Sequence, residues 1–302
     1  MTLADDILST LIVKPGTAAD LAGRDPAWKG GNHFEDMATD ELHAFAKERL
    51  QQFVDELCDA QELLWASDTC SLLLIFQALD AAGKDGTIKH IMSGVNPQGC
   101  QVYSFKQPSA EEVDHDFLWR AARALPERGR IGIFNRSYYE DVVVVQVHPE
   151  FLQHQKLPAA TVVDGTFWQQ RYEDINAFER HLDRNGTKVV KFFLNVSKEE
   201  QRQRFLRRVE NPDKYWKFSP TDLKERAHWD DYQRTFEDVI TKTSTEHAPW
   251  YVIPADHKWV MRTLVAGVVV RVIQSLELSY PAVGPEQLEA VEKARAELLA
   301  EA

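Results

Sequence analysis

The chain has 302 residues, of which 44% are hydrophobic and 10% aromatic, so it can bury a substantial core and is not a disordered segment. Its formal net charge is -12 at pH 7, which argues against a nucleic-acid coat or a general membrane-surface binder, because both need an excess of Lys and Arg. A site for a polyanion would therefore have to be a local concentration of basic residues.

The cysteines and the first residues indicate the compartment. The 3 cysteines are an odd number without C-x-x-C spacing, so neither a disulfide framework nor a zinc site is indicated. The start of the chain, MTLADDILSTLIVKPG, is acidic where a signal peptide is basic, and no apolar run approaches the roughly 20 residues that span a bilayer. We expect a cytoplasmic protein that binds neither nucleic acid nor membrane.

Residues 1–66 are expected to form an N-terminal segment that packs on the rest of the chain. Residues 1–35 contain many Gly, Pro and Asn residues, which predict an irregular segment draped over a surface. Residues 36–66 place Leu and Phe at helical intervals after Thr39 and Asp40, the candidates for the helix N-cap. This pattern predicts one long amphipathic helix.

Five short apolar runs follow, separated by helical patterns such as EEVDHDFLWRAARAL and SKEEQRQRFLRRV. The first run, CSLLLIFQALD, has no polar alternation, which is typical of a strand buried on both faces of a parallel sheet. The others are QVYSF near 101, RIGIFN near 130, KVVKFFLNV near 188 and WYVIPA near 250. Strands that alternate with helices predict an α/β fold with a parallel five-stranded sheet.

Polar, turn-rich segments follow three of these strands: QALDAAGKDG, FKQPS and FNRSYYED. In parallel sheets, ligands bind at the carboxyl ends of the strands. We therefore expect the three segments to meet at one edge of the sheet and to form a site there.

The segment QALDAAGKDG resembles a phosphate-binding loop, G-x-x-x-x-G-K-[ST], with Ala78 in place of the first glycine and Asp85 in place of the hydroxyl residue. A helical pattern, TIKHIMSGV, follows, and the N–H groups at its start would attract an anion. Lys84 is expected to bind phosphate. The other expected phosphate-binding residues of this segment are Ala82, Gly83, Asp85, Gly86 and Thr87.

Two carboxylates, Asp80 and Asp85, stand beside this expected anion site, which is repulsive unless a cation lies between them. Mg²⁺ commonly joins one or two carboxylates to substrate phosphates, so we expect Asp80 to hold Mg²⁺, which Mn²⁺ could replace. The alternative is that Asp80 or Asp85 simply caps the following helix.

The segment IFNRSYYED would bring Asn135, Arg136 and Glu140 to the same edge. Many phosphate-loop enzymes have an acidic residue at the end of this strand that holds the metal through water. Asn135 stands there, so that role is either weaker or passes to Glu140. Arg136 would place a planar cation on a transferring phosphoryl group; the alternative is a surface ion pair with Glu140 or Asp141.

Residues 198–226 contain the local basic character that an acidic protein needs to bind a polyanion. Arg204, Arg207 and Arg208 are spaced i, i+3 and i+4, so they share one face of a predicted helix. We interpret the segment as a mobile lid that closes over a phosphate chain. The alternative is that Glu199, Glu200 and Glu210 neutralise these arginines on an ordinary solvated helix face.

Five motifs in series, ALDAAGKDG, FKQPS, HDFLWR, IGIFNRSYYEDVVVVQVHPE and DKYWKFSPTDLKER, resemble the polyphosphate kinase 2 family over roughly residues 30–280. The resemblance implies a thymidylate-kinase-like, three-layer α/β/α phosphate-loop fold with a helical lid, and a homo-oligomer. It also implies reversible, Mg²⁺-dependent phosphoryl transfer from inorganic polyphosphate to nucleotides. The segment FNRSYYEDVVVVQVHPE resembles class III of the family, which accepts nucleoside mono- and diphosphates such as AMP and ADP.

The resemblance also implies roles for individual residues. Asp80, Lys84 and Arg136 match catalytic positions, with Asp80 and Glu140 at the metal, and Arg204, Arg207 and Arg208 fall on the lid helix. Many members have Asp where Asn135 stands, which leaves that metal contribution open. The expected nucleotide-binding residues are Phe105, Lys106, Pro108, Ser109, Asn135 and Glu140; for Phe105, and for Trp119 nearby, core packing is the alternative.

These features divide the chain into residues 1–66, a phosphate-loop kinase domain at 67–280 with its lid at about 198–226, and a helical tail at 281–302. Three hypotheses follow for its activity. The first is a polyphosphate-dependent nucleotide kinase, and the second is an ATP-dependent nucleoside or nucleotide kinase on the same scaffold. The third is a non-catalytic regulator that binds polyphosphate or a nucleotide, which would require the reactive constellation to be broken.

Overall fold

The structure is a computed structural model that describes residues 5–31, 34 and 37–301. A six-stranded sheet forms its centre, in the order β1-β6-β5-β2-β4-β3. The strands are β1 (Ile12–Val13), β2 (Ser71–Gln77), β3 (Cys100–Ser104), β4 (Ile131–Asn135), β5 (Thr187–Asn195) and β6 (Trp250–Pro254). Strands β2 to β6 are parallel, which confirms the five parallel strands predicted from the sequence.

The N-terminal segment is more regular than predicted. It contains helix α1 (Asp5–Thr10) and strand β1, and β1 pairs with β6 in the antiparallel direction. The prediction of an irregular 1–35 and of five strands was therefore wrong at this point, because a two-residue strand is too short to produce a periodic pattern.

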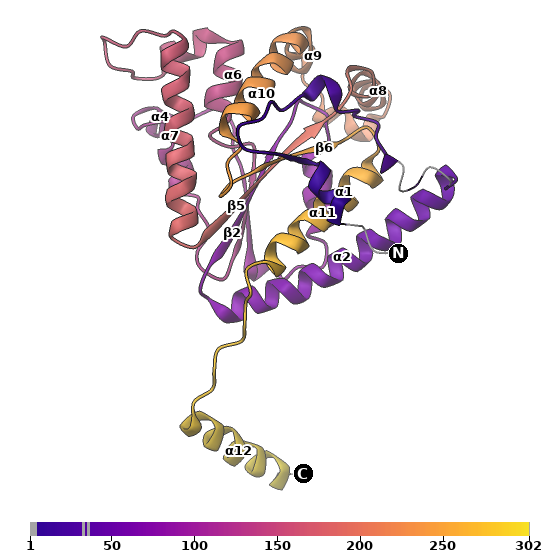
Figure 1. Ribbon diagram of the computed structural model, residues 1–302, viewed down its shortest axis with the longest axis vertical. Coiled ribbons are helices and arrows are strands. Elements are labelled where there is room, and N and C mark those ends of the chain that lie inside the picture. The colour runs from indigo at the N-terminus through magenta and orange to yellow at the C-terminus, as the bar shows by residue number, and fades with distance from the viewer. Residues whose placement is uncertain (1–4, 32–33, 35–36, 302) are drawn as a thin grey trace.

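Helices cover both faces of the sheet, so the molecule has the three-layer α/β/α architecture that was predicted (Figure 1). One layer contains α2 (Thr39–Ser67), α3 (Lys84–Ile91) and α11 (Lys258–Gln274), and the other contains α6 (Glu140–Val147), α7 (Gly165–Arg184) and α10 (Trp229–Thr243). The remaining α-helices are α4 (Ala110–Val113), α5 (Trp119–Ala122), α8 (Lys198–Val209), α9 (Pro220–Ala227) and α12 (Pro285–Ala300). Short 3-10 helices lie at Leu21–Gly23, Pro97–Gly99, Pro149–His154 and Pro212–Lys217.

The burial of the strands follows their place in the sheet. Every residue of β2 is buried, as expected for a central strand covered on both faces. Strand β3, at the edge of the sheet, leaves Val102 and Tyr103 exposed. The carboxyl ends of β2, β3 and β4 therefore open at one rim of the sheet, next to its exposed edge.

Two helical predictions need correction. The long helix begins at Thr39, but Ala38 occupies the N-cap position, and Glu41 closes the first turn by accepting a hydrogen bond from the Ala38 N–H (3.3 Å). The pattern EEVDHDFLWRAARAL forms two four-residue helices, α4 and α5, instead of one. The break lies at Asp114–Asp116, where the Asp116 carboxylate accepts from the Leu118 N–H and starts a new turn.

The C-terminal helix α12 lies apart from the body of the molecule, as Figure 1 shows, and none of its residues is buried. In the part of the chain that the structure describes, no helix is both long enough and apolar enough to cross a membrane. All three cysteines, Cys58, Cys70 and Cys100, are free thiols.

Candidate active site

The loop between β2 and α3 has the backbone shape of a tight anion-binding turn. Ala81 has φ +62° and Gly83 has φ +113°, and α3 begins directly after Gly83. A Cβ on Gly83 would lie 3.0 Å from Met261 Cε, so glycine is needed there both for its φ and for space. The ordinary φ of Gly86, and 3.5 Å to the nearest side-chain atom, place no such demand on that residue.

Lys84 is buried beneath this loop, with 8% of its surface exposed. Its ammonium group donates to the Ala78 carbonyl (2.8 Å). Burial, with a smaller contribution from the Arg136 cation, lowers the pKa of Lys84 to about 8, although Asp80, Glu140 and Asp85 partly offset the change. Lys84 is therefore a poorly solvated cation among the other predicted catalytic side chains.

Helix α8 holds the loop in place through two side chains. Gln201 donates to the Asp80 carbonyl (2.9 Å), and Arg204 donates to the carbonyls of Ala81 and Ala82. Arg204 also donates to the carbonyls of Ala255 and Asp256 and, through Nε, to Glu200 (2.8 Å). All five N–H groups of this buried guanidinium are used. The structure thus leaves Arg204 no donor for a phosphate and makes it a positioning residue for the loop.

Two further residues of the predicted phosphate site point away from an anion. Thr87 is fully buried, and its hydroxyl donates to the Gly83 carbonyl (3.0 Å). The Asp85 carboxylate accepts a hydrogen bond from Asn135 Nδ2 (2.7 Å). The sequence analysis assigned Asn135 and Asp85 to separate segments of the site, whereas in the structure their hydrogen bond joins the start of α3 to the end of β4.

Arg136 lies beside Asp80, as the convergence of the strand ends predicts. Its Nη2 donates to Asp80 Oδ1 (2.7 Å), so Asp80, rather than Glu140 or Asp141, is its ion-pair partner. Arg136 has φ +65°, a backbone conformation that residues other than glycine rarely adopt. Strain of this kind concentrates at functional sites, where the surrounding structure enforces it.

The anchor for this strained turn is a buried cluster beneath it. Tyr138 and Tyr139 both donate to Glu179 Oε1 (2.8 Å each), and Lys191 donates to Glu179 Oε2 (2.6 Å). Glu179 and Lys191 are fully buried, so each neutralises the other. The YY pair between Arg136 and Glu140 therefore fixes the start of α6 on the sheet.

Glu140 and Asp141, the first two residues of α6, are acidic groups in an apolar setting. Burial raises the pKa of Glu140, with Asp80 adding to the rise and Arg136 and Lys84 opposing it. Burial raises the pKa of Asp141 to about 6, although Arg120 and Arg171 oppose this rise. At Glu140 the attraction of Arg136 and Lys84 outweighs the repulsion of Asp80, so the pKa is raised because the effect of burial is the largest of all.

A cavity of about 570 Å³ opens beside these side chains. Of the residues predicted from the sequence, Asp80, Phe105, Lys106, Pro108, Arg136 and Glu140 line it. Another wall comes from α9 and α10 and carries Arg226, from the basic segment predicted as the lid, together with polar groups that the sequence reasoning missed, Asp222, Glu225 and Tyr232. The motif DKYWKFSPTDLKER contains Asp222 and Glu225, so attention to its acidic members could have found them.

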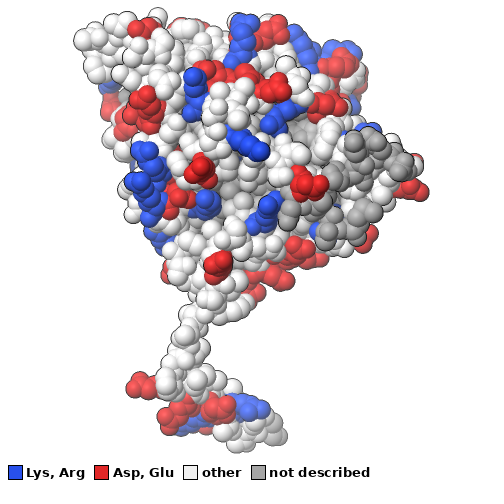
Figure 2. Space-filling model, in the orientation of Figure 1, with Lys and Arg blue, Asp and Glu red and all other residues white. Residues whose placement is uncertain are grey.

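The exposed arginines of α8 are paired with carboxylates in this structure. Arg207 donates to Glu200 (2.6 Å) and Arg208 to Asp222 (3.4 Å), and Arg202 forms a similar pair with Glu199 (2.7 Å). The alternative of neutralising glutamates therefore holds for Glu200, which pairs with Arg204 and Arg207, whereas Glu199 pairs with Arg202. Figure 2 shows the result: Lys and Arg lie among Asp and Glu over α8 and α9. Because these pairs are partly exposed, they are weak and can be exchanged for a phosphate.

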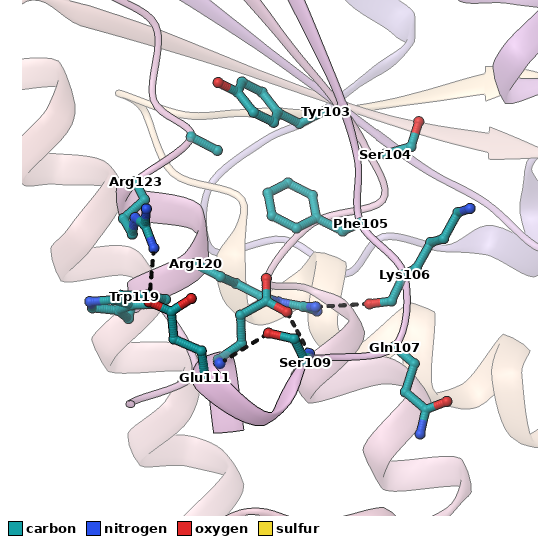
Figure 3. A pocket seen from close by; sticks show the side chains of 12 residues that line it. Tyr103, Ser104, Phe105, Lys106, Gln107, Ser109, Glu111, Trp119, Arg120 and Arg123 are labelled. Atoms are coloured by element: carbon teal, nitrogen blue, oxygen red, sulfur yellow. Dashed lines mark hydrogen bonds and ion pairs between the residues drawn. The ribbon is translucent and has the colours of Figure 1, made fainter. Parts of the chain in front are cut away.

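A second cavity, of about 590 Å³, adjoins the first and shares Phe105, Lys106 and Arg120 with it (Figure 3). Ser109 lies in this second cavity, and its hydroxyl caps α4 by accepting from the Glu112 N–H (3.3 Å). Trp119 is not in the core: it stacks on His115, with ring centroids 3.8 Å apart. Phe105 contacts the core through Phe134 and also faces both cavities, so the core alternative is only half correct for it.

Comparison with known proteins was made at the level of family, sequence and structure. The model of the polyphosphate kinase 2 family matches residues 41–280. The chain is 49% identical over 275 residues to an ADP-polyphosphate phosphotransferase of Rhodopseudomonas palustris, covering 91% of each protein. It is 42% identical to an AMP/ADP-polyphosphate phosphotransferase of Meiothermus ruber, covering 89% of this chain and 94% of that protein.

Among solved structures, the crystal structure of a polyphosphate kinase 2 from Arthrobacter aurescens TC1 matches with a TM-score of 0.86 and 37% sequence identity, covering 100% of this chain and 99% of that one. The motifs in the sequence, the position of the loop at the strand ends and the length of the family match all point to the same family. The chain belongs to the polyphosphate kinase 2 family.

Proposed function

We propose that the protein transfers a phosphoryl group reversibly between inorganic polyphosphate and nucleoside mono- and diphosphates, with Mg²⁺. The observation that carries this proposal is the meeting of Lys84, Arg136, Asp80 and Glu140 at the strand ends, beside a cavity of about 570 Å³ that α9 borders. Family membership and the names of the similar proteins support the same reaction.

The chemistry requires placement and neutralisation of charge more than proton transfer. The terminal phosphate of a nucleotide is already anionic near neutral pH, so its attack on polyphosphate needs no strong general base. Lys84 and Arg136 would neutralise the negative charge that spreads over the transferring phosphoryl group. Arg136 donates through Nη2 to Asp80, and its other guanidinium N–H groups would donate to phosphate oxygens as a planar fork.

The lid helices would complete the site when the substrate binds. Arg208 lies at the Asp222 side of the cavity and Arg207 beside Glu200, so both are placed to follow a phosphate chain once their carboxylate partners release them. Closure of α9 over the cavity would exclude water, which otherwise competes for the phosphoryl group.

The residues present fit a divalent cation only when the substrate contributes to its binding. In residues 5–31, 34 and 37–301, no group of three His, Cys, Asp or Glu side chains could hold a metal ion alone. Asp80 and Glu140 provide two hard oxygen donors whose repulsion a cation would relieve, and Mg²⁺ is commonly held by one or two carboxylates plus phosphates. A bound Mg²⁺ would neutralise phosphate charge and align donor with acceptor.

The range of acceptors is the finer part of the proposal. The two similar proteins differ in the acceptors that their names state, ADP for one and AMP/ADP for the other. We propose that this chain accepts both AMP and ADP, as the resemblance of the segment FNRSYYEDVVVVQVHPE to class III of the family implies. A cytoplasmic location and assembly into a homo-oligomer also stay predictions.

The test is an assay with purified protein and Mg²⁺ in which AMP and ADP are separate acceptors, polyphosphate or GTP is the donor, and products are resolved chromatographically. ADP and ATP formed from AMP with polyphosphate alone would support both the reaction and the acceptor range. ATP formed only from ADP would overturn the acceptor range. Activity only with GTP would instead indicate an ordinary nucleotide kinase, and binding without turnover would indicate a regulator. A parallel reaction with EDTA tests the need for the metal.

A further inference from the structure

One buried carboxylate oxygen of a residue that lines the cavity has no hydrogen-bond donor. Asp141 is buried, with 6% of its surface exposed, and lines the cavity of about 570 Å³. Its Oδ1 accepts from Gln155 Nε2 (2.9 Å), but its Oδ2 is buried and has no partner. A buried acceptor of this kind is costly unless something else supplies the donor.

The neighbours of Asp141 hold this arrangement and do not satisfy Oδ2. Arg171 donates through Nη1 to the Asp141 carbonyl (2.8 Å) and through Nη2 to Gln155 Oε1 (2.5 Å). The Gln155 amide is therefore fixed with its NH₂ group toward Asp141 Oδ1. The nearest cation, Arg120 Nη2, is 3.8 Å from Oδ2, which is too far for a hydrogen bond.

Arg120 is held by other contacts, so its guanidinium does not approach Asp141 Oδ2 closely enough to donate a hydrogen bond. Its Nη1 donates to the Lys106 carbonyl (2.8 Å), the contact drawn in Figure 3, and its guanidinium lies over the Phe105 ring (5.3 Å). The free oxygen of Asp141 and the Nη2 of Arg120 together form an acceptor next to a donor. An amino group beside a ring nitrogen, as on adenine, has the complementary order of donor and acceptor.

The surroundings of this acceptor suit a flat base. Phe105, Val144 and Phe151 line the same cavity and give it apolar and aromatic walls. Arg136, which would bind phosphate, and Asp80, which would hold the metal ion, line the cavity from the segments that follow β4 and β2, whereas Asp141 lines it from α6. A nucleotide with its phosphate at the loop would therefore carry its base toward the part of the cavity that Asp141 occupies.

We propose that Asp141 Oδ2 accepts a hydrogen bond from the exocyclic amino group of the acceptor nucleotide's base, so that Asp141 is a specificity-determining residue for an amino-bearing base such as adenine. The inference rests on the proposed function, because it needs a nucleotide as acceptor. The proposal gives Asp141 a role toward the base of the nucleotide, and the roles proposed for the residues around the phosphate stay unchanged.

The test compares two acceptors that differ only in the amino group, AMP and purine riboside 5′-monophosphate, at pH 8 with saturating polyphosphate and Mg²⁺. For the wild type we expect kcat/KM to be about 10- to 100-fold higher for AMP, since a site built around a donor rejects the analogue that lacks it. In Asp141→Asn, the fixed Gln155 amide keeps the Asn carbonyl at the Oδ1 position, so an NH₂ group replaces Oδ2 and faces the amino group of AMP. The AMP preference should then fall to within about threefold.

Purine riboside monophosphate also reports whether the variant is folded, because its kcat/KM should change by less than about threefold in Asp141→Asn. Asp230→Asn, which alters an exposed carboxylate on α10, is the matched control and should keep the wild-type preference. An unchanged preference in Asp141→Asn, or an equal loss for both acceptors, would overturn the inference. So would a change confined to discrimination between AMP and 2′-deoxy-AMP, which would assign the hydrogen bond to the ribose. If the wild type transfers phosphate from polyphosphate to neither monophosphate, the proposed acceptor range fails instead, and if it does not phosphorylate ADP either, the proposed function fails.

Discussion

Lys84→Met should stabilise the metal-free, ligand-free protein at neutral pH, although Lys84 is the proposed phosphate-binding lysine. The wild-type ammonium is 8% exposed, and burial lowers its pKa from the ordinary value of 10.5 to about 8. Below pH 8 both the folded and the unfolded chain carry this proton, so the folded state bears the full cost of the buried charge. Between pH 8 and 10.5 the folded state loses the proton before the unfolded state does, and stability therefore rises with pH.

The size of this effect follows from the two pKa values. A difference of 2.5 pKa units corresponds to about 3 kcal/mol at pH 7, of which about 2 kcal/mol is regained by pH 9.5. Urea unfolding of the wild type and of Lys84→Met, in EDTA at several pH values from 7 to 9.5, measures this contribution of Lys84 to stability. All other groups titrate in both proteins, so the difference between the two free energies of unfolding reports the titration of Lys84. We expect the stability gap in favour of Met to narrow by about 2 kcal/mol over this range. Parallel curves would refute the conclusion that Lys84 is a desolvated cation.

Four other tests concern the loop, its supports and the lid. Gly83→Ala should destabilise the protein by more than about 1 kcal/mol, whereas Gly86→Ala, at an ordinary φ in α3, should be neutral or stabilising, as thermal unfolding would show; equal losses would contradict the φ argument. Arg204→Lys should cost about 3 kcal/mol because a lysine cannot bind four carbonyls at once, and Arg207→Lys, on an exposed pair, should cost less than about 0.5 kcal/mol; similar values from urea unfolding would place Arg204 in an ordinary ion pair. Arg136→Lys should lower kcat by about 10- to 1,000-fold with an unchanged unfolding midpoint, since a point charge cannot replace the fork; wild-type kcat would remove Arg136 from the reaction. Arg207→Ala with Arg208→Ala should raise KM for long polyphosphate more than for AMP and reduce its salt dependence; equal changes in both KM values would argue against the lid.

The sequence predicted the sheet well because its signals are local. Leu72–Phe76 in β2 form an unbroken apolar run, and such a run has few alternatives to a strand buried on both faces. Strand β1 escaped prediction because Ile12 and Val13 are strand only through pairing with Tyr251 and Trp250, which lie far away in the chain.

The site was predictable to the extent that it depends on strand ends. Asp80 and Arg136 follow neighbouring parallel strands, so the topology brings them together, and they form an ion pair. The partners of single side chains are decided by packing, which no spacing reveals. Arg204, Arg207 and Arg208 share a face by sequence, yet Arg204 turns inward to the loop while Arg208 turns to α9. An ion pair of Asp141 with Arg136 was one alternative from the sequence, whereas Arg120 and Gln155 are the neighbours of Asp141 in the structure.

Several unfavourable features lie together at the loop between β2 and α3, the end of β4 and the start of α6. Ala81 and Arg136 both have left-handed backbone conformations, Lys84 is a desolvated cation, and Glu140 is a desolvated carboxylate. Other contacts maintain this arrangement: Arg204 and Gln201 hold the loop, and the Glu179 cluster holds the start of α6. A site whose charges are only partly compensated, on a backbone that cannot relax, is suited to bind a ligand that supplies the missing charges. A phosphate chain with a divalent cation has that composition, since its oxygens satisfy Lys84 and Arg136 while the cation satisfies Asp80 and Glu140. Lower stability in the absence of substrate is thus the consequence of charged groups that already stand at the strand ends when the substrate arrives, before the lid closes.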